Sequence, residues 1–173
     1  MRYKNVAMWA GVALAAGLLI SPARAANTEV FAAKLLGDNE VPPINSNGKA
    51  TFQMEIASSG TITFTLTFSG LSSNIILSHL HFAPPKVAGG VMIFLCGGGG
   101  QPSCPAATSG TITGTITAAN VTGPTAQGIT AGDLASALEA VGDGISYANI
   151  HSTNFPGGEI RGQVVRVSSH GRD

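Results

Sequence analysis

The clearest alternation of hydrophobic and polar residues lies between residues 49 and 68. Two alternating runs, 49–56 and 61–68, are separated by the short polar segment 57–60. The hydrophobic positions are Ala50, Phe52, Met54, Ile56, Ile62, Phe64, Leu66 and Phe68, and those between the last four are threonines. Because successive side chains of a strand point to opposite faces, this pattern predicts an antiparallel hairpin with one buried and one exposed face.

Shorter runs extend the prediction to the rest of the chain. We expect further strands at 30–36, 75–82, 91–95 and 111–116, and two more, 147–151 and 159–165, around a proline- and glycine-bearing turn. One helix is expected, with Thr130 as its N-cap and Gly142 at its C-terminal end. About eight strands with one short helix predict an all-β fold, a Greek-key antiparallel β-sandwich, over residues 26–167.

Both ends of the chain are expected to lie outside this domain. Arg2 and Lys4 precede an apolar run of 15 residues, and Ala23-Arg24-Ala25 follows as a small-x-small cleavage site. This pattern predicts a secretory signal peptide over 1–25 and places the mature protein in the periplasm or outside the cell, without a membrane span after cleavage. A membrane anchor is the alternative, but the run is short for a bilayer span. The tail 168–173 is expected to be disordered.

Removal of the signal peptide changes the charge. The full chain balances nine Lys and Arg against nine Asp and Glu, and loss of Arg2, Lys4 and Arg24 leaves six against nine, a formal charge of −3. A mildly acidic chain without a basic cluster argues against nucleic acid and anionic membranes as partners.

Cys96 and Cys104 flank a glycine-rich segment and are the two cysteines of the sequence. In an oxidising compartment we expect them to form one structural disulfide. A redox-active or metal-binding pair is the alternative, although the spacing is not that of a C-x-x-C motif.

His79 and His81 are two residues apart, so on a strand both imidazoles project from the same face. His151 lies on another predicted strand and supplies a third ligand if the strands meet. Three histidines in this arrangement suit copper or zinc. The alternative interpretation is that each histidine is a core residue whose ring is hydrogen-bonded to a backbone carbonyl.

Three more polar residues lie beside the histidines in sequence. Asn149 shares the face of its strand with His151, and Glu159 shares a face with Arg161. Glu159 is a candidate to complete the metal sphere or to orient a ligand, and Asn149 and Arg161 are candidates for supporting or structural roles. Glu159 and Arg161 are expected to hold the last strand in register, either as buried, paired charges or at an exposed rim.

Several of these segments together resemble the CHRD domain, named from chordin and found alone in secreted bacterial proteins. The matching pieces are 31–37, 39–43, 48–52, 78–81, 147–152 and 154–163, and the resemblance covers about residues 30–167. It implies an immunoglobulin-like or superoxide-dismutase-like sandwich, and bacterial members have no generally established activity. The glycine-rich Cys96–Cys104 loop departs from the shorter family pattern.

Two functions of different classes follow. The first is a non-enzymatic exported module that binds a protein, a glycan or a metal. The second is a copper-dependent, superoxide-dismutase-like oxidoreductase, which rests partly on analogy of fold. The sequence contains no nucleophile elbow, no phosphate-binding glycine loop and no evident carboxylate pair, and it identifies no catalytic residue.

Overall fold

The computed structural model describes residues 28–167. The predicted signal peptide and the predicted disordered tail lie outside the described residues. The strands are β1 (Glu29–Leu36), β2 (Lys49–Ile56), β3 (Ile62–Ser69), β4 (Ile75–Phe82), β5 (Gly90–Cys96), β6 (Gly110–Ile116), β7 (Ser146–Ser152), β8 (Ile160–Gln163) and β9 (Val165–Arg166). One α-helix, α1 (Leu134–Gly142), precedes β7, and three short 3-10 turns lie in the loops.

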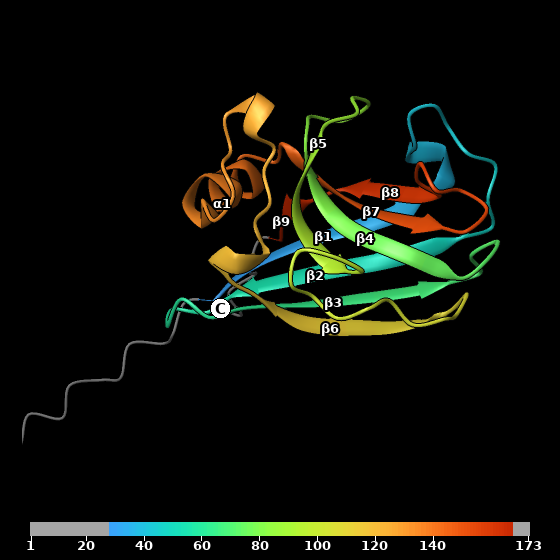
Figure 1. Cartoon of the computed structure of the whole chain (residues 1–173), viewed down its shortest axis with the longest axis horizontal. Coiled ribbons are helices and arrows are strands. Elements are labelled where there is room, and N and C mark those ends of the chain that lie inside the picture. The colour runs from blue at the N-terminus through green and yellow to red at the C-terminus, as the bar shows by residue number, and fades with distance from the viewer. Residues whose placement is uncertain (1–27, 168–173) are drawn as a thin grey trace, which may run out of the picture.

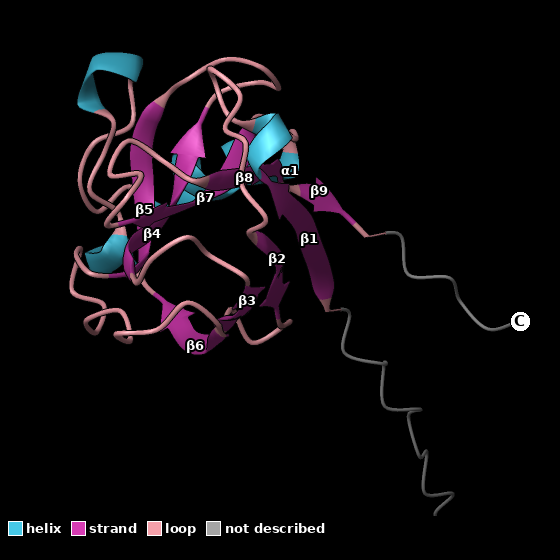
Figure 2. Ribbon diagram, turned by 90° about the vertical axis from the view of Figure 1, so that its right-hand side faces the viewer, coloured by secondary structure: helices cyan, strands magenta, loops and turns pink. Residues whose placement is uncertain are grey.

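All nine strands belong to one antiparallel sheet. The order is β5-β4-β7-β8-β1-β2-β3-β6, with β9 paired to β1. The sheet curls until it is nearly barrel-shaped, and its two ends, β5 and β6, lie on the same side of the molecule (Figures 1 and 2). The all-β antiparallel prediction is confirmed, but hydrogen bonding joins the strands continuously and does not divide them between two sheets. Within residues 28–167, no helix is long and apolar enough to cross a membrane.

The predicted hairpin is confirmed as β2 and β3. Phe52 pairs with Leu66 and Met54 with Phe64. All four side chains are buried, while the positions between them along both strands are exposed. Burial of alternate positions therefore fixes which face of the hairpin meets the core, since a slip of one residue would exchange the faces.

The helix begins later than predicted. Its N-cap is Asp133, whose carboxylate accepts a hydrogen bond from the Ser136 amide at 3.1 Å. Gly132 has a φ of +84° and donates its amide to the Val121 carbonyl, so the chain still turns at that point and Thr130 cannot be the cap. The helix buries Ala137, Ala140 and Val141 in the core.

Cys96 and Cys104 form a disulfide, as predicted, in the connection between β5 and β6. Gly99 in this loop has a φ of +54°, and its backbone lies against the Phe94 ring, where an added Cβ would meet ring carbons at 2.8 Å. Phe94 in turn contacts His79, with ring centroids 5.1 Å apart. The disulfide loop therefore packs behind an aromatic neighbour of the histidines.

Candidate metal centre

Polar residues gather on the outer face of three neighbouring strands, opposite the core. The register aligns His79 of β4 with Asn149 of β7 and Arg161 of β8, and aligns His81 with Tyr147. We call the following six buried residues the polar layer: His79, His81, Tyr147, Asn149, His151 and Arg161. On the opposite face of the same strands, Leu80, Ala148, Ile150 and Ile160 belong to the hydrophobic core.

The fold brings His79, His81 and His151 together, as predicted. The ring centroid of His79 lies 4.6 Å from that of His81 and 4.6 Å from that of His151. One ligand nitrogen from each histidine lies within 4.8 Å of the other two. Three points so spaced all lie within about 2.8 Å of a common centre. Since metal–nitrogen bonds are near 2 Å, a small inward movement of the rings would reach bonding distance.

Hydrogen bonds to the backbone orient two of the rings. Nδ1 of His81 lies 2.9 Å from the Gly89 carbonyl oxygen, and Nδ1 of His151 lies 2.8 Å from that of Pro156. A carbonyl oxygen only accepts, so Nδ1 must carry the proton and Nε2 of each neutral ring keeps its lone pair. Metal-bound histidines are commonly held by such a bond from their other nitrogen.

Three of the remaining ring nitrogens are buried without a hydrogen-bond partner. Nδ1 of His79 and Nε2 of both His81 and His151 are buried and unpaired. A buried polar atom without a partner is costly and is rare in folded proteins. The alternative of core histidines satisfied by carbonyls therefore accounts for only one nitrogen each of His81 and His151. The three unpaired nitrogens all belong to the histidine cluster.

Burial keeps the three imidazoles neutral. It lowers the pKa of His79 to about 2, with the neighbouring His81 and His151 acting in the same direction. Burial also lowers the pKa of His81 to about 4 and depresses that of His151. Neutral imidazole is the form that binds a metal, so no proton needs to be displaced at neutral pH.

A stack of side chains continues from the histidines to β8. The Tyr147 ring lies parallel to that of His81, with centroids 4.6 Å apart and an interplanar angle of 3°. The Arg161 guanidinium carbon lies 4.6 Å from the centroid of the Tyr147 ring. Tyr147 therefore separates the cationic Arg161 from His81 and fixes the orientation of that histidine by packing.

Arg161 pairs with Glu40, a residue that the sequence interpretation did not single out. Nε of Arg161 lies 3.7 Å from Oε2 of Glu40 and donates to the Asn39 carbonyl at 2.6 Å. Asn149 donates from Nδ2 to Oε1 of the same glutamate, also at 2.6 Å. Glu40 falls in the segment 39–43 of the CHRD resemblance, and this resemblance was the sequence feature that could have pointed to Glu40.

Glu159 is fully buried but is not part of the histidine cluster. Its Oε1 accepts hydrogen bonds from the Ser46 hydroxyl at 2.6 Å and from the Ser72 amide at 2.8 Å. Burial alone would raise the pKa of Glu159, but hydrogen bonds from Ser152, Ser46 and Ser72 outweigh it and hold that pKa below its usual value. Glu159 thus ties three loops together as an ionised carboxylate.

A comparison with family models agrees with the resemblance in the sequence. The model described as the CHRD domain matches residues 31–164. Searches of curated proteins and of solved structures found no match. The matched range begins in β1, ends after β8 and includes the whole polar layer. The chain therefore belongs to the CHRD domain family.

Proposed function

We propose that this protein is an exported CHRD module that binds one transition-metal ion through His79, His81 and His151, without being an enzyme. The observation that carries the proposal is the convergence of three buried histidines, each of which has a buried ring nitrogen without a hydrogen-bond partner. Two of the rings are already oriented by backbone carbonyls, and all three are neutral at pH 7 because burial lowers their pKa values. The ligands would need only a small rearrangement on binding.

Copper is the metal that we expect, with zinc second. With equal nitrogen ligands, divalent copper binds more tightly than zinc in the Irving–Williams order. Imidazole suits both metals, so the ligand type does not discriminate further between them. An exported protein also meets both metals outside the cytosolic buffering systems. The expected site has three protein ligands, and Asn149 and Arg161 support the strand that carries His151.

Burial favours a binding role over the superoxide-dismutase-like alternative. The unpaired nitrogens of the cluster each expose less than 1 Å² to solvent. A catalytic metal needs an open coordination position that its substrate can reach. Among residues 28–167, the histidines form the one cluster of possible metal ligands, so a second metal site has no support.

Titration of Cu(II) into the metal-free mature protein tests the proposal. Calorimetry should show one site per chain, with Cu(II) bound more tightly than Zn(II). His81→Ala and His151→Ala should each abolish that site. His170→Ala is the matched control, since His170 is the fourth histidine of the sequence and is not one of the three proposed ligands; it should bind like the wild type.

Two outcomes would contradict the proposal. One is the absence of binding by the wild type. The other is an unchanged affinity in His81→Ala, provided that circular dichroism shows this variant to be folded. His81→Gln, which keeps a polar side chain of similar size, serves as the second variant if His81→Ala does not fold.

A further inference from the structure

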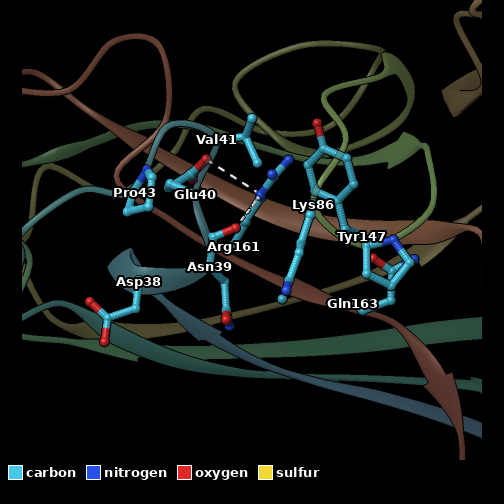
Figure 3. A pocket seen from close by; sticks show the side chains of 11 residues that line it. Asp38, Asn39, Glu40, Val41, Pro43, Lys86, Tyr147, Arg161 and Gln163 are labelled. Carbon is cyan, nitrogen blue, oxygen red and sulfur yellow. Dashed lines mark hydrogen bonds and ion pairs between the residues drawn. The ribbon is translucent and has the colours of Figure 1, made fainter.

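A pocket of about 420 Å³ lies beside the metal centre, on the other side of Tyr147 and Arg161 from the histidines. Its walls come from three parts of the chain: the loop after β1, the loop after β4, and strands β7 and β8. Val41, Pro43 and Pro85 supply apolar surface, and Tyr147 closes one side (Figure 3). The volume falls within the usual range for small-molecule sites.

Two of the polar side chains around this pocket, Glu40 and Gln163, are already engaged. Both carboxylate oxygens of Glu40 are used, one by Asn149 and one by Arg161. The Gln163 amide nitrogen donates to the Ala83 and Gly144 carbonyls. The Asp38 carboxylate lies at the far end of the pocket, turned away from Lys86 and Tyr147 (Figure 3).

The Lys86 ammonium group, like the Asp38 carboxylate, is not engaged. In the described part of the chain, Lys86 forms neither an ion pair nor a side-chain hydrogen bond. Arg161, which also lines the pocket, keeps one guanidinium nitrogen, Nη2, buried and without a partner. The unsatisfied polar groups of the pocket therefore include two cationic donors, while the nearer carboxylate is already bound.

The backbone at Lys86 is also unusual. Its φ of +65° makes it the single non-glycine residue in the left-handed region among residues 28–167. A residue with a Cβ adopts this conformation at a cost, which is met only where the surroundings hold it. Here the neighbouring Val87 carbonyl accepts a hydrogen bond from Nη1 of Arg161 at 3.1 Å. The strained turn keeps Lys86 at the pocket.

We propose that this pocket binds a small organic carboxylate with a compact apolar body. The carboxylate pairs with the Lys86 ammonium, and the apolar body packs on Val41, Pro43, Pro85 and the edge of Tyr147. Arg161 adds positive charge from the wall of the pocket, where Tyr147 and the Val87 carbonyl hold it in place. The site does not require the metal, and its ligand does not reach the histidines.

Benzoate and benzamide form a matched pair of probes, because they share the ring and differ in charge. Amide chemical shifts of the metal-free mature protein should move on addition of benzoate, chiefly at Val41, Lys86 and Val87. Benzamide should bind up to about fivefold more weakly, the discrimination expected of one solvent-exposed ion pair. Lys86→Gln should lower the affinity for benzoate to that for benzamide. Lys49→Gln, on a different part of the sheet, is the control and should leave both affinities unchanged.

Three results would overturn the proposal. These are an affinity for benzamide equal to that for benzoate, shifts confined to other parts of the molecule, and no shifts at about 10 mM benzoate, where even millimolar binding would be visible. Because the titration uses metal-free protein, failure here leaves the metal proposal untouched. Failure of the copper titration likewise leaves this pocket untouched.

Discussion

The two halves of the curled sheet carry polar residues on their outer faces, but only one of these faces is covered. On β2, β3 and β6, the outer positions are exposed and include Thr51, Thr63, Thr65, Thr67, Thr111, Thr113 and Thr115. On β4, β7 and β8, the outer positions form the buried polar layer. Strand β3 alternates strictly between buried and exposed residues, whereas every residue of β7 is buried.

The difference shows what covering a polar face demands. On the open face, water can reach the threonine hydroxyls, so the loss of one partner leaves no group buried and unpaired. On the covered face, every donor and acceptor needs a partner within the protein. Glu40 pairs with both Arg161 and Asn149, although Nη2 of Arg161 and Oδ1 of Asn149 have no partner. The histidines leave one nitrogen each without a partner, so the covered face is where a ligand is expected.

The largest effect on stability is expected at low pH, where the histidines of the covered face become protonated on unfolding. For His79 and His81 the pKa values in the folded protein, about 2 and about 4, lie below the ordinary 6.5. At a pH between the folded and unfolded pKa values, the unfolded chain binds more protons than the folded protein. The stability that the neutral histidines contribute is therefore fully present above pH 6.5 and is lost as the pH falls below it. Two or three such histidines should cost the metal-free protein about 3–5 kcal/mol between pH 6.5 and 5. Urea unfolding at several pH values measures this loss.

A His79→Gln, His81→Gln double variant is the control for the pH effect and should show a shallower dependence in that interval. Glu40 acts in the opposite direction, because burial raises its pKa above the ordinary value of a glutamate despite the neighbouring Arg161. A wild-type stability that stays constant from pH 6.5 to 5 would show that the histidines are not buried in solution.

The second prediction compares the two ion pairs of the described chain. Arg161→Ala leaves Glu40 buried without its partner and should destabilise the protein by about 3–5 kcal/mol. Arg166→Ala removes an ion pair with Glu29 in which both side chains are about half exposed, and should cost under about 1 kcal/mol. Chemical denaturation of both variants at pH 7 gives the two values. Equal losses would mean that Arg161 is not held as the structure has it.

The smallest effect is expected on the open face. Thr67 and Thr111 share a cross-strand hydrogen bond of 3.1 Å between exposed hydroxyls. Thr67→Ala should destabilise the protein by under about 1 kcal/mol, because water replaces the lost partner. A thermal melt compared with that of Arg161→Ala tests the contrast. A loss as large as that of Arg161→Ala would indicate that this face is covered too.

The sequence predicted what depends on local period and, apart from the convergence of His151 with His79 and His81, did not predict which distant residues meet. Alternation identified the hairpin of β2 and β3, and the spacing of His79 and His81 placed both rings on one face. The convergence with His151 followed once β4 and β7 paired. By contrast, Glu40 and Arg161 are 121 positions apart in the sequence, and no local pattern relates them. The helix cap was misplaced because the left-handed turn at Gly132 depends on a contact with Val121.

The cover over the histidines also has a kinetic consequence. The carbonyls of Gly89 and Pro156, which orient His81 and His151, lie in the loops after β4 and β7. Local opening of either loop would release a ring from its orientation, and because the unpaired nitrogens are buried, access to them also requires local opening. A metal ion would enter and leave only during such openings, at rates set by their frequency. Retention by this protein would then be governed by the time that the cover stays closed, as well as by the strength of the bonds to the metal.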